Sequence, residues 1–466
     1  MVGVRASTRV AAQYNPSLEI PHMTKPGSKS SQPLASLQDA NPSRRTFMKG
    51  STLAVVGGTL AANLSVSRLA HGAGADETIK VGLIGCGGRG TGAASQALHT
   101  TGPVKLVAMG DAFEDRLNDS YNNLQKDGEI AGKIDVPAER RFVGFDAHKQ
   151  VIDAGVDLVI LATPPGFRPQ HLAAAVDAGK HVFMEKPVAI DAAGVRSVLA
   201  SVAKAKEKNL GLGVGLQRHH QAAYLETVKR LQDGAIGDFV VGRCYWNGAG
   251  LWVHPRKPEQ SEMQYQMRNW YYFNWLCGDH IVEQHIHNID VINWVKGAHP
   301  IRAEGMGGRQ VRVAEQFGEI YDHHAVEFEY EDGTRMFSYC RHIPGCWDSV
   351  TEHVHGTKGT CDVSAGIIRA AGEKPWKYRG EGGNPYQVEH DDLFASIRAG
   401  TPLNEGENGA LSTMTAIFGR MATYSGKMLR WDDALASEIT YTPSEITWES
   451  TPPVPTVAVP GQTRVV

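Results

Sequence analysis

The segment 79–99 constrains the fold of this chain more than any other part of the sequence. An apolar, β-branched run, Ile79–Ile84, leads directly into the glycine-rich stretch Gly85–Gly90, and Thr91–His99 then has a helical pattern. A G-x-G-x-x-G stretch between a buried strand and a helix is typical of a loop that binds the pyrophosphate of a dinucleotide. The glycines allow a tight turn and a close backbone approach, and the helix N-terminus favours negative charge.

A second apolar run, Val104–Met109, ends near Asp111, which follows Gly90 by 21 residues. A dinucleotide-binding fold places at this spacing the acid that accepts hydrogen bonds from the adenosine ribose. A carboxylate there repels a 2′-phosphate, so the sequence favours NAD over NADP. The alternative is that Asp111 only caps the next helix.

Strands and helices continue to alternate after this first unit. Val156–Leu161 is followed by Thr163-Pro164 and a helical stretch, and His181–Met184 is followed by Glu185-Lys186-Pro187. This alternation predicts an α/β fold with a doubly wound parallel sheet that binds its ligand at the carboxyl edge.

The length of 466 residues predicts two domains. With 42% hydrophobic and 21% charged residues, the composition excludes a fully disordered or collagen-like chain. Residues 1–75 carry a net charge of +6, and the remainder carries −9. A body this acidic argues against nucleic-acid binding. We expect a leader at 1–75, a dinucleotide-binding domain at 76–200, a substrate and oligomerisation domain at 201–450, and a tail at 451–466.

The basic leader has the order of a secretory signal. Arg44-Arg45 and Lys49 precede residues 50–67, which carry no charge, and Ala73-Gly74-Ala75 offers a cleavage site. The paired arginines resemble the bacterial twin-arginine signal, which exports folded proteins. The apolar stretch is too rich in Gly and Ser to hold a bilayer well. We therefore expect export to the periplasm without stable membrane insertion.

The cysteines show no C-x-x-C spacing, which argues against a zinc ribbon or a redox dithiol. All six follow the leader: Cys86, Cys244, Cys277, Cys340, Cys346 and Cys361. One alternative is that Cys340 pairs with Cys346 after export. Six separate thiols are favoured because the chain folds first in a reducing compartment.

Glu185-Lys186-Pro187, about a hundred residues after the glycines, makes a family resemblance specific. Together with Ala162-Thr163-Pro164-Pro165, Gly356–Thr360 and the later stretch Glu389–Gly400, it resembles the Gfo/Idh/MocA family of glucose–fructose oxidoreductase and inositol dehydrogenase relatives. The resemblance implies a second α+β domain with an open, mostly antiparallel sheet that covers the nicotinamide. The implied cofactor contacts are Gly85, Gly87, Gly88, Arg89, Gly90, Asp111, Thr163, Pro164, Glu185 and Lys186.

The segment 278–290 carries most of the titratable groups near the expected site. On one continuous helix, His280, Glu283, His287 and Asp290 share a face. The family carries D-x-x-x-H-x-x-D here, so the resemblance implies that His287 is the acid–base group and Asp290 the final acid. Glu283 replaces the usual Asp, and His285 replaces the usual Gly, which we expect to fill space in the pocket.

Alcohol oxidation needs a base or proton relay near the hydroxyl. We therefore expect Lys186 to orient the hydroxyl, His287 to take its proton and Glu283 to assist. An alternative is that His280, Glu283, His285 and His287 bind a metal. The one-face geometry leaves out His285 and the family offers no precedent, so no metal is expected.

An aromatic cluster lies upstream, comprising Tyr245, Trp246, Trp252, Trp270, Tyr271, Tyr272 and Trp275. Such rings suit stacking on sugar faces, or equally a core or oligomer interface. We expect substrate contacts from Lys186, Arg218, Trp270, Tyr271, His280 and Asp290. The Pro- and Val-rich tail 451–466 is expected to fray rather than to embrace a neighbouring subunit.

Three functions are compatible with these features. The favoured one is an oxidoreductase that uses tightly held NAD on a sugar or polyol hydroxyl and assembles as a homo-oligomer. The second is a glycosidase that oxidises its sugar transiently and regenerates NAD. The third is a noncatalytic sugar-binding protein on a retained dinucleotide fold.

Overall fold

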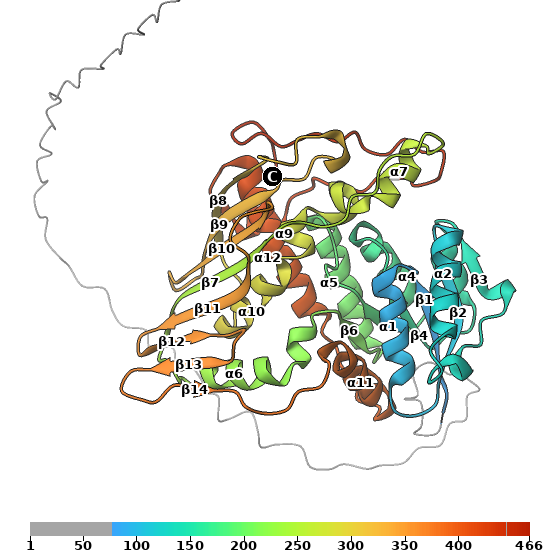
Figure 1. Ribbon diagram of the computed structural model, residues 1–466, viewed down its shortest axis with the longest axis horizontal. Coiled ribbons are helices and arrows are strands. Elements are labelled where there is room, and N and C mark those ends of the chain that lie inside the picture. Colours follow the sequence, from blue (N-terminus) through green and yellow to red (C-terminus); the bar gives the residue numbers. More distant parts are fainter. Residues whose placement is uncertain (1–76, 444) are drawn as a thin grey trace, which may run out of the picture. The chain divides into compact units, whose positions relative to one another are not determined.

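The computed structural model describes residues 77–443 and 445–466 (Figure 1). The proposed leader, with Arg44, Arg45 and the cleavage site, lies outside the described residues. Within the described part, no helix combines the length and apolar character needed to cross a membrane.

The first sheet is parallel throughout and has the strand order β3-β2-β1-β4-β5-β6, which is that of a Rossmann fold. Its strands are β1 Ile79–Ile84, β2 Val104–Asp111, β3 Arg141–Val143, β4 Leu158–Leu161, β5 His181–Met184 and β6 Leu212–Val214. Its helices are α1 Gly88–His99, α2 Glu114–Gln125, α3 Ala147–Asp153, α4 Arg168–Asp177 and α5 Ala192–Glu207. Strands β4 and β6 are buried at every residue, as a sheet covered on both faces requires. Strand β6 belongs to this first sheet but follows residue 200, where we expected the first domain to end.

The second sheet has the order β14-β13-β12-β11-β7-β10-β9-β8-β15, and only the β7–β10 pair is parallel among its described strands. The strands are β7 Phe239–Gly248, β8 Arg302–Gly308, β9 His323–Glu329, β10 Arg335–His342, β11 Ser349–Gly356, β12 Gly359–Asp362, β13 Ile367–Ala370, β14 Trp376–Lys377 and β15 Leu429–Arg430. The predicted fold class is confirmed: a Rossmann domain is followed by an open, mostly antiparallel sheet.

Helices cover one face of the second sheet and also reach the first domain. The helices of this part of the chain are α6 Ala222–Gln232, α7 Glu262–Arg268, α8 Asn274–Cys277, α9 His280–Glu283, α10 Ile286–Lys296, α11 Pro385–Arg398, α12 Gly406–Ser425 and α13 Trp431–Leu435. Among them, α10 and α12 pack against strands of the second sheet. Figure 1 shows α12 between this sheet and α5, and α12 packs against both β8 and α5. Helix α11 packs beside α1. The two domains therefore share an interface that includes the α12–α5 and α11–α1 contacts.

The C-terminal tail is packed, so the expectation of a frayed end is wrong. Ala458 and Val465 are buried. Tyr321 donates a hydrogen bond to the Ala458 carbonyl at 2.9 Å, and the Ser437 hydroxyl donates to the Val465 carbonyl at 2.9 Å. Apolar burial and these bonds offset the entropy of ordering the tail. All six cysteines are unpaired, and Cys346 alone among them is exposed.

Candidate functional site: a dinucleotide cleft and a Lys–Glu–His cluster

Two glycines of the loop after β1 are required by close backbone contacts. Gly85 has φ +98°, and a Cβ there would lie 2.5 Å from the Thr163 nitrogen. A Cβ on Gly90 would lie 1.9 Å from the Gly85 carbonyl oxygen. Helix α1 therefore packs directly on the turn, as predicted for the first and third glycines of this motif.

The middle of the same loop faces open space. In the described part of the chain, no atom lies within 4 Å of a Cβ built on Gly87 or Gly88, and no side chain caps the start of α1 at Gly87. The first amides of a helix without such a cap are free to bind an anion. The loop thus fits the pyrophosphate of a dinucleotide.

A cleft of about 580 Å³ opens in front of this loop. Asp111 and Phe113 line it at the end of β2, and Thr163 and Pro164 line it at the end of β4. The predicted cofactor residues Gly85, Gly87, Gly88, Arg89 and Gly90 also line it. The volume is in the usual range for a cofactor or ligand site.

Asp111 lies in this cleft with both carboxylate oxygens in use. Oδ2 accepts from the Cys86 amide at 2.6 Å, and Oδ1 accepts from the Phe113 amide at 2.8 Å. Burial raises the pKa of Asp111, and these two bonds oppose that rise. Each carboxylate oxygen can accept a second bond, so Asp111 remains available to ribose hydroxyls.

We expect Asp111→Ala to weaken NAD binding and to narrow the preference for NAD over NADP. The carboxylate is lost as a ribose partner, and its repulsion of a 2′-phosphate is lost with it. Titrating both nucleotides against the wild type and Asp111→Ala, by quenching of protein fluorescence, measures the change. Tighter binding of NADP than NAD by the wild type would contradict the assignment.

Two buried charged residues support the ends of β4 and β5. Arg168, which the motifs did not indicate, donates to the carbonyls of Leu161 at 2.5 Å and Thr163 at 2.7 Å. Glu185 pairs with Arg89 at 2.9 Å, and burial raises the pKa of Glu185. Glu185 therefore tethers the start of α1 to the strand end that carries Lys186.

Lys186 reaches across to the second domain and meets Glu283. Its Nζ lies 2.9 Å from Glu283 Oε1 and also donates to the Glu283 main-chain carbonyl. Each side chain is 13% exposed, so the pair is largely shielded from water yet remains accessible. The structure thus brings together two of the three residues predicted to be catalytic.

His287, the third of these residues, lies close enough to Lys186 for the ammonium charge to act on its imidazole. Burial lowers its pKa well below the usual value, and the positive charges of Lys186 and Arg218 lower it further. No described residue hydrogen-bonds to its Nδ1. The imidazole is therefore unprotonated at ordinary pH, which is the state that a proton acceptor requires.

Arg218 is fixed by a buried acid that the sequence did not reveal. Its NH1 lies 2.5 Å from Oε1 of Glu352, a side chain on β11 that is fully buried. Asn288 donates to the same oxygen, and the Tyr224 hydroxyl donates to Oε2 at 3.1 Å. Burial raises the pKa of Glu352. Arg218 is therefore positioned beside His287 by a network that spans three elements.

The single helix expected over 278–290 is interrupted. Helix α9 ends at Glu283 and α10 begins at Ile286. The His285 amide donates to the His280 carbonyl five residues back, which inserts an extra residue into the turn and rotates α10 relative to α9. His280, Glu283, His287 and Asp290 therefore do not share one face.

His285 does not fill the pocket as expected. Its Nε2 lies 2.8 Å from the Ser338 hydroxyl and 3.7 Å from Cys244 Sγ, both on strands of the second sheet. Burial lowers the pKa of His285 to about 3. This side chain therefore packs on the sheet as a neutral group.

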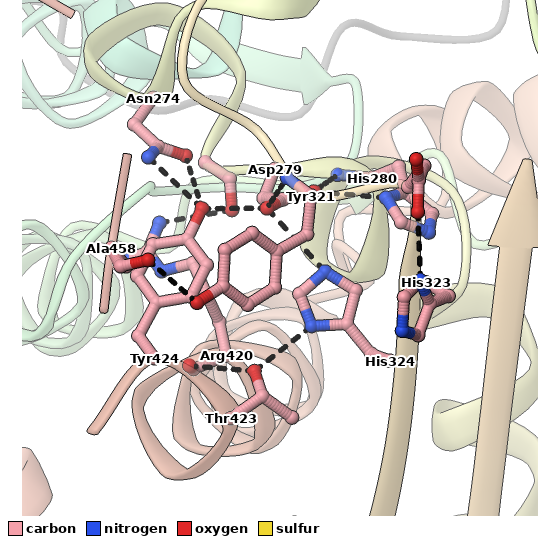
Figure 2. Close-up of polar contacts among 12 residues, drawn as sticks. Asn274, Asp279, His280, Tyr321, His323, His324, Arg420, Thr423, Tyr424 and Ala458 are labelled. Carbon is pink, nitrogen blue, oxygen red and sulfur yellow. Dashed lines mark hydrogen bonds and ion pairs between the residues drawn. The ribbon is translucent and has the colours of Figure 1, made fainter. Parts of the chain in front are cut away.

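A buried polar cluster around Asp279 anchors the start of α9 (Figure 2). Asp279 has φ +74°, a backbone conformation that favours glycine. Its carboxylate accepts from His280 Nδ1 at 2.9 Å, the Tyr321 amide at 2.9 Å and the Tyr424 hydroxyl at 2.6 Å. These bonds hold the backbone that leads to Glu283. His280 is fully buried in this cluster, so the expected substrate contact is replaced by a structural one.

Among the described residues, one group of three potential metal ligands occurs, namely Asp279, His280 and His324, with ligand atoms within 4.8 Å of one another. Each Asp279 oxygen already takes part in two hydrogen bonds, Oδ1 with the amide and ring of His280 and Oδ2 with Tyr321 and Tyr424, so this group is accounted for as a polar network. It does not contain Glu283, His285 or His287, which the alternative metal site required.

The three other residues predicted to contact substrate are Asp290, Tyr271 and Trp270, and each has different surroundings in the structure. Asp290 is buried and accepts from His219 at 2.8 Å and Ser412 at 2.7 Å, so it fastens α10 to its neighbours instead of facing substrate. Tyr271 is buried, and its hydroxyl has no partner among the described residues. Burial raises the pKa of Tyr271, and the negative charge of Glu283 raises it further. The Tyr271 hydroxyl therefore lies near Glu283 and its partner Lys186. Trp270 lines the dinucleotide cleft.

Two family models match the chain and together span more than half of it. One, described as an oxidoreductase family with an NAD-binding Rossmann fold, matches residues 79–215, and the GFO/IDH/MocA C-terminal domain matches residues 224–362. Inositol 2-dehydrogenase 3 of Saccharopolyspora erythraea is 26% identical over 319 residues, which cover 65% of this chain and 80% of that protein. An inositol 2-dehydrogenase of Burkholderia cenocepacia is 27% identical over 263 residues, which cover 56% of this chain and 66% of that protein.

Solved structures share the fold. Aldose-aldose oxidoreductase from Caulobacter crescentus matches with a TM-score of 0.60 at 19% identity, covering 76% of this chain and 100% of that one. Scyllo-inositol dehydrogenase from Lactobacillus casei, with bound NAD(H) and scyllo-inositol, matches with a TM-score of 0.57 at 21% identity, with the same coverage.

Proposed function

The chain belongs to the Gfo/Idh/MocA family of NAD-binding oxidoreductases, and we propose that it oxidises a hydroxyl group of a sugar or polyol. The observation that carries this proposal is the meeting of Lys186 with Glu283, close to a neutral His287, where the second domain meets the strand ends of the first. The inositol dehydrogenases among its relatives support a polyhydroxylated substrate.

NAD, when bound in the cleft, supplies the hydride acceptor. Glu283 holds the Lys186 ammonium, which can still donate a hydrogen bond to the substrate oxygen. That bond orients the hydroxyl and stabilises negative charge on its oxygen. His287, kept neutral by burial and by two nearby cations, takes the hydroxyl proton as the carbonyl forms.

We further propose export through the twin-arginine pathway and a closed redox cycle. A protein exported after folding can carry NAD with it, and free NAD to exchange with should be scarce outside the inner membrane. A cofactor reduced there must be reoxidised in the same site, either by a second carbonyl substrate or by an intermediate of the same sugar. Returning the hydride to an intermediate of the same sugar is the route that the glycosidase alternative uses.

The test is to purify the protein from the periplasmic fraction, dialyse it exhaustively and assay sugars and polyols without added NAD. We expect bound NAD to be released on denaturation, and turnover to proceed without added cofactor. Free sugar produced from a glycoside would identify the glycosidase route. An empty protein that turns over only with a continuous supply of NAD contradicts the closed cycle. Absence of both product formation and any nicotinamide absorbance change with every sugar and polyol contradicts the oxidoreductase. Homo-oligomer formation stays a prediction, which the mass of the purified protein in solution tests.

A further inference from the structure

Side chains of the second domain close one side of the dinucleotide cleft. Five of its lining residues come from the segment 252–270, namely Trp252, His254, Met267, Arg268 and Trp270. They line the same cleft as Asp111, which we expect to accept hydrogen bonds from the adenosine ribose. We call the segment 252–270 the clasp.

Arg268 fastens the clasp to the first domain. Its NH2 lies 2.7 Å from Asp115 Oδ1 in α2, and its guanidinium carbon lies 3.7 Å from the ring centroid of Phe113. The ion pair lowers the pKa of Asp115. The contact therefore combines an ion pair with a cation–π interaction at the rim of the cleft.

The C-terminal segment adds a second fastening through Trp448. The ring centroid of Trp448 lies 5.1 Å from that of Phe113 and 4.5 Å from that of Phe145. Phe113 and Phe145 both line the cleft, and Trp448 packs against the same apolar cluster as Trp270. Residues from the first domain, the clasp and the C-terminal segment thus share one apolar cluster around the cleft.

Hydrogen bonds of Asn269 and Gln266 fix the conformation of the clasp. The fully buried Asn269 accepts from the His254 amide at 3.0 Å and donates to the Gln316 carbonyl at 2.8 Å. Gln266 donates to the Pro453 carbonyl at 3.2 Å, which links the clasp to the C-terminal segment. This hydrogen bond connects the segment that carries Arg268 to the segment that carries Trp448.

We propose that the clasp and Trp448 retain the dinucleotide, so that NAD leaves the cleft only after Arg268 and Trp448 separate from the start of α2. This inference rests on the dinucleotide binding of the proposed function and not on its sugar chemistry. It gives a physical basis for a cofactor that stays bound through export. The residues responsible lie away from Lys186 and His287.

The experiment measures how fast bound NADH is released. The full mature chain is loaded with NADH, desalted and chased with excess NAD while the nicotinamide fluorescence is followed. We expect Arg268→Ala and Trp448→Ala each to raise the NADH dissociation rate about tenfold. Added salt should accelerate release from the wild type more than from Arg268→Ala, because salt screens the Arg268–Asp115 pair.

Two further variants keep the result interpretable. Arg302→Ala removes a surface ion pair to Glu329 on the second sheet and should release NADH at the wild-type rate. Trp448→Phe keeps an aromatic ring against Phe113. Its NADH dissociation rate should therefore lie between the rates of the wild type and Trp448→Ala. Wild-type release rates in both alanine variants, with equal salt dependence, overturn the proposal. Normal NADH release without turnover of any sugar would instead contradict only the proposed reaction.

Discussion

Lys186→Ala is expected to lower kcat about a thousandfold while leaving NADH binding near that of the wild type. The ammonium pairs with Glu283 at 2.9 Å and is the group positioned to hold the substrate oxygen. Without it, the developing charge on that oxygen has no fixed partner. Steady-state kinetics over a range of sugars and polyols, together with an NADH titration, measures both quantities.

The same variant should change the pH profile in a defined direction. Lys186 is one of the charges that lower the pKa of His287, so its removal raises that pKa. The acidic limb of the residual activity should therefore move to higher pH. Lys204→Ala, which removes a comparable lysine–carboxylate pair with Asp177 on the surface, should leave rate and profile unchanged. Full activity of Lys186→Ala would remove this residue from the mechanism.

His287→Gln is expected to lower kcat by a factor of about a hundred to ten thousand. Glutamine keeps a polar side chain of similar length but cannot accept the hydroxyl proton. The pKa of His287 lies well below the usual value for histidine, so the imidazole stays neutral where an exposed histidine would become protonated. Wild-type activity should therefore not change across the pH range in which an exposed histidine titrates.

The matched control is His99→Ala, because His99 lies on α1 and pairs with surface acids away from the cluster. It should retain wild-type kinetics. NADH binding and thermal unfolding of His287→Gln should remain close to normal, which separates a chemical defect from a folding defect. A His287→Gln enzyme that keeps the wild-type kcat would show that another group takes the proton.

The first domain could be predicted because its signals are local. The strand before Gly85, the helix after Gly90 and the apolar runs of β4 and β5 each specify their own conformation within a few residues. The steric reasons for Gly85 and Gly90 are contacts across one turn, which the motif already encodes. Right-handed connections between parallel strands then determine the topology.

The candidate site could be predicted only in part. Lys186, Glu283 and His287 were identified from motifs, and the structure brings them together. His280 and Asp290 were assigned to the same face because an unbroken helix was assumed. One extra residue in the turn between α9 and α10 separates Asp290 from the face that carries Glu283, and Asp290 instead binds Ser412. His280 is held in the buried cluster by its neighbour Asp279.

The sequence by itself determined the dinucleotide loop and the parallel sheet, because each depends on neighbours along the chain. The family resemblance indicated Lys186, Glu283 and His287 as the residues that handle the proton. Only the tertiary structure decided that Glu352 fixes Arg218, that Trp270 lines the dinucleotide cleft and that Trp448 packs beside it. These contacts join residues from distant strands, helices and the tail. Their partners are chosen by burial and by hydrogen bonding in the folded protein, and no spacing in the sequence records that choice.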